Sequence, residues 1–582
     1  MRSMASWAAM MVAAAMAVNG SAQAGREDEA AKNAAPAAGG TASEGADTAA
    51  VQPMQRALLE AQQKLADQSE AMRQLREQME RQGREIDELR QRLPREDAVA
   101  TAAVTAARLE GAAAALRTHP ASPEGGAAAA EGARIAARVP MEGPATLYFR
   151  IGNATFTPSG WVDFTTYYRS TDVGSGLGTT FQAIPYSNTV QGGQSETRFT
   201  AQSSRIGLKV DETVQAVKAY GYLEADFNGY LPGNAYVSTN SNTLRMRVYY
   251  LNLAHGKWEV LGGQAWSLLT PTRKALCPFL DQLFNTFHLD TSYQAGLVYA
   301  RQPQLRVVYH PSESAAMGLS VEDPEQYSGS AVTFPTLFST TQTDINSSTG
   351  SGGATATPNV HPDVVAKVTW DPTVAGLRWH VGAAGLLTSV RVVTPATVTK
   401  GAAASDEREG GGGIGNLYLQ LFRGFHLIAL GYWSDGGGRY IGGIAPGFVV
   451  LQPGAATAPF RAALLHSGSG IGGFEWMVPG NTTISAYYSG VYAERRYGLD
   501  PAVKTATEVG YGFPGSANTN NRSIEEASFA STTTLWKNSA YGALQLITQS
   551  SWVLREPWFL APQTPKDAHL FMEFANVRFV LP

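Results

Sequence analysis

Regular alternation of apolar and polar side chains, repeated over many short segments, is the feature that most constrains how this chain can fold. It is easily followed between residues 203 and 267. The apolar members of the alternation there are Ile206, Leu208, Val210, Val217, Ala219, Leu223, Ala225, Phe227, Met246, Val248 and Tyr250. The charged members between them are Arg205, Lys209, Lys218, Glu224, Asp226, Arg245 and Arg247. Because successive side chains on a β-strand point to opposite faces, this segment predicts four strands, each with one apolar and one charged face.

The same alternation continues to the end of the chain, where the joints between strands differ regularly in length. Short joints, such as 255–257, alternate with long ones rich in Gly, Ser, Thr and Pro, such as 389–413 and 435–460. An even strand number with this alternation is typical of an all-β transmembrane antiparallel β-barrel of the bacterial outer membrane. The sixteen strands that we predict are 156–169, 199–210, 216–228, 244–255, 257–267, 298–310, 314–323, 362–371, 377–388, 414–423, 425–434, 468–478, 482–493, 523–537, 541–556 and 568–581.

Aromatic residues gather at the ends of these predicted strands, as in the aromatic girdles of membrane barrels. Examples are Tyr167, Tyr168, Trp258, Trp266 and Trp433. The alternative is a large soluble β protein, such as a propeller or a solenoid. Such proteins repeat with a period of about 20–50 residues, and the sequence contains no repeat of that kind. The barrel is therefore the favoured architecture.

Composition and motifs narrow the function classes. The chain has 582 residues, a formal net charge of −4 and one cysteine, Cys277. The net charge gives no overall positive field for nucleic acid, and one cysteine can form neither an intramolecular disulfide nor a cysteine-based metal site. The sequence contains no phosphate-binding loop, metal-ligand cluster or spacing that defines a catalytic triad. We therefore expect no enzyme activity, no cofactor and no metal site.

The N-terminal part of the chain differs from the barrel pattern. Residues 1–24 have the positive charge, the apolar segment and the small-residue end of a secretory signal peptide. Residues 25–52 have almost nothing to bury, so we expect disorder. Residues 95–143 form an Ala-rich linker, and the barrel is expected to occupy 144–582.

Residues 53–94 carry a heptad repeat. Leu58, Leu65, Met72, Met79, Ile86 and Leu93 recur every seven residues. A second set follows three positions later at Ala61, Gln68, Leu75, Gln82 and Leu89. This pattern predicts a coiled coil. A lone amphipathic helix would need a core nearby, but both flanking segments are of low complexity, so self-association is favoured. The repeat fits a trimer as well as a dimer.

Three motifs resemble the early strands of Gram-negative porins. They are Ser204-Arg205-Ile206-Gly207-Leu208, Tyr222-Leu223-Glu224-Ala225-Asp226-Phe227 and Gly262-Gly263-Gln264-Ala265-Trp266-Ser267. With a signal peptide and a coiled coil ahead of the barrel, the layout is similar to that of the DcaP-like porins. This resemblance implies a sixteen-stranded barrel, trimerisation, a periplasmic coiled coil and passive uptake of small, often anionic, solutes. One departure is the chain end at Leu581 and Pro582, where such barrels usually have a terminal aromatic residue.

The residues expected to line the pore come from the strands and from one long joint. Segment 268–297 is more apolar than the other long joints, so we expect it to fold into the lumen; the alternative is packing on a neighbouring subunit. Arg245 and Arg247 should face one side of their strand and attract a passing anion or carboxylate. The expected pore-lining or constriction residues are Arg205, Lys209, Lys218, Glu224, Asp226, Arg245, Arg247, Arg273, Lys274, Asp281 and Arg306.

The sequence thus favours an outer-membrane porin for passive diffusion of small hydrophilic solutes, with a preference for anions or carboxylates. Its expected partners are outer-membrane lipid, two further copies of itself and the transported solutes. Two alternatives remain. One is a structural anchor tethered to the cell wall, with peptidoglycan bound by the periplasmic coiled coil. The other is a phosphate-selective porin, which should have a denser Lys/Arg ladder and two more strands.

Overall fold

The computed structural model describes residues 147–229, 242–276, 294–329, 331–343 and 359–582. The segments expected as signal peptide, disordered stretch, coiled coil and linker lie outside these described residues, as does Asp281. Among the described residues, no helix is both long enough and apolar enough to cross a membrane.

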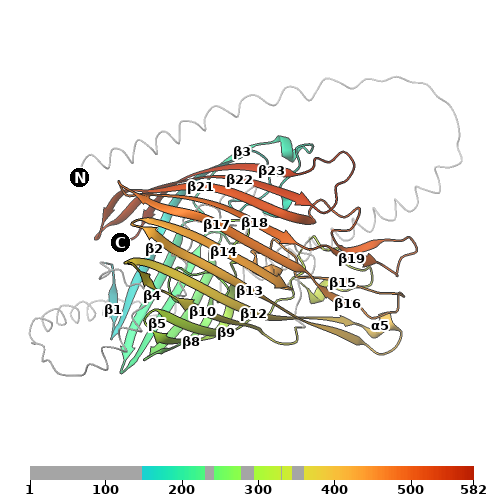
Figure 1. Cartoon of the computed structure of the whole chain (residues 1–582), viewed down its shortest axis with the longest axis horizontal. Coiled ribbons are helices and arrows are strands. Elements are labelled where there is room, and N and C mark those ends of the chain that lie inside the picture. Colours follow the sequence, from blue (N-terminus) through green and yellow to red (C-terminus); the bar gives the residue numbers. More distant parts are fainter. Residues whose placement is uncertain (1–146, 230–241, 277–293, 330, 344–358) are drawn as a thin grey trace, which may run out of the picture. The chain divides into compact units, whose positions relative to one another are not determined.

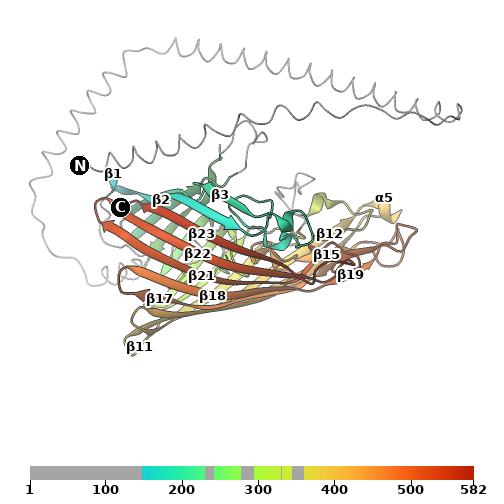
Figure 2. The same ribbon diagram turned by 90° about the horizontal axis from the view of Figure 1, so that it is seen from above.

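The described strands form one antiparallel wall that closes on itself (Figures 1 and 2). Each wall strand pairs with the next, and β23 pairs with β2, with Trp161 opposite Val580 and Arg169 opposite Met572. The predicted sixteen-stranded barrel is confirmed. The sixteen wall strands within the described ranges are β2 (Ala154–Arg169), β4 (Arg205–Val214), β5 (Val217–Asp226), β6 (Arg245–His255), β7 (Trp258–Trp266), β8 (Arg301–Ser312), β9 (Ala315–Glu322), β10 (Asp363–Trp370), β12 (Leu377–Thr394), β13 (Ala404–Phe422), β14 (Phe425–Asp435), β17 (His466–Val478), β18 (Thr482–Ala493), β21 (Asn521–Asn538), β22 (Gly542–Pro557) and β23 (Ala568–Val580).

Shorter elements complete the described part of the chain. β3 (Glu196–Thr200) continues the line of β4 and pairs with the second half of β2, so the predicted strand 199–210 is interrupted. The other short strands are β1 (Phe149–Ile151), β11 (Thr373–Val374), β15 (Phe448–Leu451), β16 (Arg461–Leu464), β19 (Arg496–Leu499) and β20 (Glu508–Tyr511). The described helical turns are η1 (Phe181–Ala183), η2 (Gln191–Gly193), η4 (Thr340–Gln342), α5 (Ala396–Thr399) and η5 (Gly438–Tyr440).

The wall is apolar on its outer face and polar on its inner face. In β8, Gln304 and Arg306 are buried, whereas Leu305 is 58 % exposed. In β6, Asn252 is 5 % exposed and its neighbour Leu251 is 49 % exposed. A soluble protein would bury the leucines and expose the polar residues. The reverse arrangement is that of a barrel whose outer face meets hydrocarbon and whose interior is polar.

The alternation in β6 is broken at Arg247. The pairing register between β5 and β6 shifts next to Glu224, which faces Val248. Arg247 is therefore the extra residue of a β-bulge, and beyond it the two faces are exchanged. Val248 and Tyr250 are buried, while Tyr249 is 47 % exposed. The prediction that Val248 and Tyr250 share an apolar outer face was wrong, because alternation alone does not reveal a bulge.

Strands β12 and β13 run well beyond the predicted ends. The prediction of a long joint at 389–413 was wrong for most of its length, because β12 continues to Thr394 and β13 begins at Ala404. Figure 1 shows this extension at the end of the barrel that also carries α5, β15 and β19, here called the long-loop end. The extension is stabilised by an apolar cluster of its own, formed by Phe338, Val390, Val392, Val398, Phe448, Val450, Phe460 and Ala462.

Polar contacts also hold the long connections together. The backbone N–H and the hydroxyl of Thr336 both donate to Asp500, each at 2.7 Å. Burial alone would raise the pKa of Asp500, but these bonds and one from the backbone of Ala502 outweigh burial and lower that pKa. Distant loops are thus joined at the long-loop end.

We expect Gly160 to be essential for closing β2 against β4. Its φ is +135°, and an added Cβ would lie 2.2 Å from the carbonyl oxygen of Arg205. Gly160→Ala should therefore reduce the fraction of chain that refolds in detergent, since the strain alone costs about 1–3 kcal/mol. The folded fraction can be measured by gel mobility in SDS with and without heating.

Gly472→Ala, in β17, is the matched control, because an added Cβ there meets nothing within 4 Å. Equal refolding of Gly160→Ala and Gly472→Ala would contradict the prediction.

Candidate functional site

The connection between β7 and β8 enters the barrel. Its first described part, 267–276, bonds in turn to strands of the inner wall from β9 to β17. The backbone N–H of Leu268 donates to Glu322 of β9 at 3.0 Å, and Lys367 of β10 donates to the carbonyl of Thr270 at 2.6 Å. Arg273 then pairs with Glu475 of β17, with one bond of 2.9 Å. Although β9 and β10 are neighbours, β17 is separated from β10 by β12, β13 and β14, so the segment runs across the interior from β9 to β17.

The second described part of this connection, 294–300, lies against another region of the inner wall. Glu526 of β21 accepts the backbone N–H of Ala295 at 2.7 Å. The carbonyl of Tyr440 in η5 accepts the N–H of Tyr299 at 2.9 Å. The contacts of both described ends agree with the predicted inward fold of 268–297.

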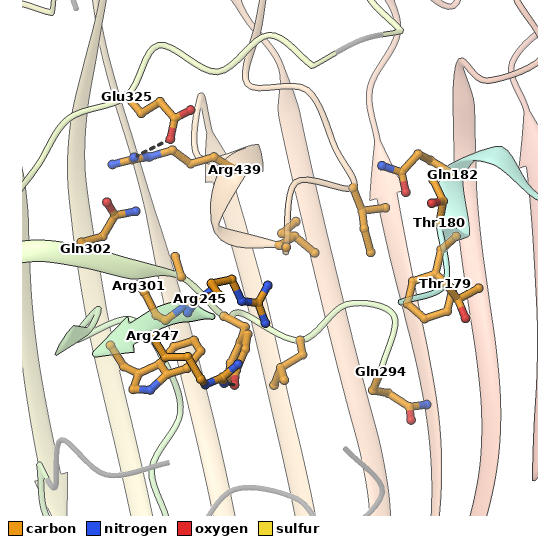
Figure 3. A pocket seen from close by; sticks show the side chains of 18 residues that line it. Thr179, Thr180, Gln182, Arg245, Arg247, Gln294, Arg301, Gln302, Glu325 and Arg439 are labelled. Carbon is orange, nitrogen blue, oxygen red and sulfur yellow. Dashed lines mark hydrogen bonds and ion pairs between the residues drawn. The ribbon is translucent and has the colours of Figure 1, made fainter. Parts of the chain in front are cut away.

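A cavity of about 430 Å³ lies where this connection meets the β2–β3, β9–β10 and β14–β15 connections. Figure 3 shows two unlike sides. One side carries the guanidinium groups of four arginines, and the other carries neutral hydroxyl and amide groups. The residues of the first side are Arg245, Arg247, Arg301 and Arg439, with Glu325 and Gln302 beside them. Those of the second side are Thr179, Thr180, Gln182 and Gln294.

Two of the four arginines are held by carboxylates on the neighbouring strand. Arg245 forms a bidentate pair with Asp226, at 3.0 and 2.6 Å. Arg247 donates to Glu224 at 2.7 Å and to Asp226 at 2.6 Å. Arg205 lies 3.3 Å from the same Glu224. The predicted arginine pair is thus part of a cluster of three cations and two anions, which fixes the direction of each planar guanidinium.

Arg439 is held from another direction. It donates to Asp363 of β10 at 2.5 Å, and its other terminal nitrogen lies 3.7 Å from Glu325. The Tyr440 hydroxyl also donates to Asp363, at 2.8 Å. The bonds from Arg439 and Tyr440 to Asp363 hold η5 inside the barrel. The prediction of 435–460 as a long outer joint was wrong for Gly438–Tyr440, all of which are buried.

The other predicted pore residues lie in different places. Arg306 is 3 % exposed and donates to Gln304 within the β8 wall. It is not among the residues that line the cavity. Lys209 and Lys218 are half-buried in β4 and β5, outside the cavity lining. Lys274 is exposed next to Arg273 and is also absent from the lining. Of the ten predicted residues that the structure describes, Arg245 and Arg247 line this cavity.

Sequence reasoning missed Arg301, Arg439, Glu325 and Gln182. A signal existed for Arg439: it precedes an apolar run, Tyr440 to Leu451, in a joint that should otherwise be polar. That is the same criterion that identified 268–297. No local signal distinguishes Gln182 or Glu325 from ordinary loop residues. Among the described residues, no group of three or more His, Cys, Asp or Glu side chains could hold a metal ion.

The closed wall with a polar interior and an apolar exterior defines the class of this molecule, a transmembrane β-barrel. No protein-family model matches the chain, and no curated protein sequence matches it. Among solved structures, the outer membrane channel DcaP of Acinetobacter baumannii is similar with a TM-score of 0.50 and 16 % identity, over 74 % of this chain and 99 % of that one. At this identity the similarity shows the fold alone.

Two further solved structures have lower scores. The anion-selective porin from Comamonas acidovorans matches with a TM-score of 0.40 and 12 % identity, over 74 % of this chain and 100 % of that one. Salmonella typhi OmpF in complex with daunomycin matches with a TM-score of 0.39 and 8 % identity, over 75 % and 100 %. The fold expected from the DcaP-like resemblance is confirmed by the first comparison.

We expect the pair between Arg273 and Glu475 to anchor the inward connection to β17. Arg273→Glu and Glu475→Arg should each lower the stability of the folded barrel by about 3 kcal/mol, because each leaves like charges together in a largely buried place. The double exchange should recover most of that loss. Denaturant unfolding in detergent, followed by tryptophan fluorescence, measures these differences.

The control combines Glu475→Arg with Arg378→Glu, which changes an exposed arginine of β12 instead. This combination should not recover stability. If it recovers as much as the true exchange, the anchor is not a direct pair.

Proposed function

We propose that this chain forms a passive diffusion channel of the outer membrane for small hydrophilic solutes, with a modest preference for anions or carboxylates. The observation that carries the proposal is the cavity inside the closed barrel. Its lining contains four guanidinium groups and one carboxylate, whereas the carboxylates that hold these arginines, Glu224, Asp226 and Asp363, are not part of the lining.

The barrel supplies the passage and the inward connections supply its narrowing. A barrel of sixteen strands is wide enough to contain water unless something fills it. Here four connections enter or border the interior and leave a polar cavity of about 430 Å³ among them. Selectivity in such a channel depends on the groups at the narrow part rather than on the wall elsewhere.

The expected strength of the preference for anions follows from the charges in the cavity lining and directly behind it. The lining arginines Arg245, Arg247, Arg301 and Arg439, together with Arg205 behind them, carry five positive charges. Glu325 in the lining and Glu224, Asp226 and Asp363 behind it carry four negative charges. A solute inside the cavity meets the donors first, but at longer range the charges nearly cancel. We therefore expect weak selectivity for anions, not exclusion of neutral solutes.

The similarity in fold to the outer membrane channel DcaP supports a channel rather than an enzyme. A trimer, a periplasmic coiled coil at 53–94 and outer-membrane lipid as the surrounding medium remain part of the proposal. The phosphate-selective alternative is less favoured, because the described wall has sixteen strands instead of eighteen. The anchor alternative is less favoured because the described interior contains an open polar cavity.

The channel proposal predicts open conductance in planar bilayers and a reversal potential of anion sign in a salt gradient. Arg245→Gln with Arg247→Gln should shift that potential toward cations, because Glu224 and Asp226 then remain without these two positive partners. The shift should correspond to at least about a twofold change in the anion-to-cation permeability ratio, since charged rings at a constriction dominate selectivity.

Arg408→Gln is the control, because Arg408 lies on the extension of β13 and pairs with Asp406 away from the cavity. It should leave the reversal potential unchanged. A folded barrel without conductance would favour the anchor. A conducting barrel with a cation preference that the double variant leaves unchanged would contradict the anion part of the proposal.

A further inference from the structure

We propose that the cavity favours a small monoanion that carries several hydroxyl groups, of the sugar-acid class, over a dianion with the same carbon skeleton. This inference rests on the channel function proposed above and names the class of solute. It depends on three features of the cavity: the different chemistry of its two sides, its small net charge, and the packing of other side chains around its tryptophan ring.

The two sides of the cavity offer different chemistry to a solute that spans it. The guanidinium side presents planar donors that match one carboxylate. On the other side, Gln182 and Thr180 are half-buried and supply an amide and a hydroxyl (Figure 3). Thr179 and Gln294 are already bonded there, to Arg169 and to Ser489. A solute held at one end by an arginine therefore meets neutral polar groups at its other end.

The charge balance disfavours a second carboxylate. The four lining arginines and Arg205, which lies beside Glu224, carry five positive charges against the four negative charges of Glu325, Glu224, Asp226 and Asp363. The net charge of about one positive matches one carboxylate and leaves none for a second. A monoanion can be satisfied by hydrogen bonds from a guanidinium, because the field that it meets at close range is positive. The second charge of a dianion would lie in the same nearly neutral surroundings and near the carboxylate of Glu325. No described cation lies on the opposite side of the lining to pair with it.

An aromatic solute is also disfavoured, although Trp266 belongs to the lining. The ring of Trp266 lies 3.7 Å from that of Tyr299, centroid to centroid. The guanidinium groups of Arg247 and Arg301 lie 5.8 and 5.5 Å from the same ring. With these groups around it, Trp266 has little surface left for stacking, and it is only 5 % exposed. Hydroxyl groups, which pair with Gln182 and Thr180, fit the second side better.

A matched series of six-carbon solutes tests the proposal. Sorbitol, gluconate and glucarate share an open six-carbon chain and differ mainly in the number of carboxylates, which is zero, one or two. Reconstituted in liposomes, the full-length channel should pass gluconate faster than either of the others, by about fivefold, the factor that one net hydrogen bond is worth. Open conductance in potassium chloride, recorded on the same preparation, establishes that the channel is present.

Two variants separate charge from hydrogen bonding. Glu325→Gln removes the carboxylate of the lining and should raise the flux of glucarate relative to gluconate by at least twofold. Its control is Glu407→Gln, which removes an exposed carboxylate paired with Arg391 outside the cavity. Gln182→Leu should lower the flux of gluconate, whereas Gln191→Leu, in the same connection but exposed and outside the lining, should not.

The outcomes distinguish this inference from the function on which it rests. A folded barrel with no conductance overturns both. Normal conductance with glucarate passing as fast as gluconate overturns the solute class and leaves the channel function standing. Equal effects of Gln182→Leu and Gln191→Leu would also overturn the solute class, because the neutral side would then take no part in selection.

Discussion

Hydrogen bonding of the backbone in hydrocarbon is the constraint on which this structure depends, because a lipid-exposed N–H or C=O without a partner costs several kcal/mol. The wall satisfies this requirement by closing on itself, because its last strand, β23, pairs with the second half of its first strand, β2. The other edge of β2 is shared between β3 and β4. At the β2–β23 seam the inner face is also joined by side chains, since Arg578 donates to Asp163 at 2.7 and 2.8 Å and Asn576 donates to Thr165 at 2.6 Å.

Closure forces polar residues inward, and each inward charge then needs a partner. Glu224 and Asp226 provide it for the arginines of β6, Asp363 provides it for Arg439, and Glu475 provides it for Arg273. The last two of these pairs also hold connections inside the barrel. The same electrostatic requirement that makes the interior stable therefore positions the segments that narrow it.

The wall was predictable because alternation is local: one strand and its two joints suffice to recognise it. The bulge at Arg247, the extension of β12 and the insertion of Arg439 were not, since each depends on a partner distant in the chain. Val392 is buried by Phe448 and Phe460, and Arg439 pairs with Asp363. The residues of the candidate site could be predicted only in part, for the same reason. Arg245 and Arg247 follow from strand periodicity, whereas Gln182 and Glu325 are brought to the cavity by loops.

The paired state of the arginines explains how a donor-rich cavity can still serve passive diffusion. Binding must be favourable enough for entry but weak enough for release. An arginine without a carboxylate in a narrow, partly dry lumen would bind an anion strongly, because the interaction is less screened there than in water. Asp226 reduces this attraction by occupying part of the donor capacity of Arg245 and Arg247. The carboxylates behind the cavity are therefore expected to increase flux even as they decrease affinity.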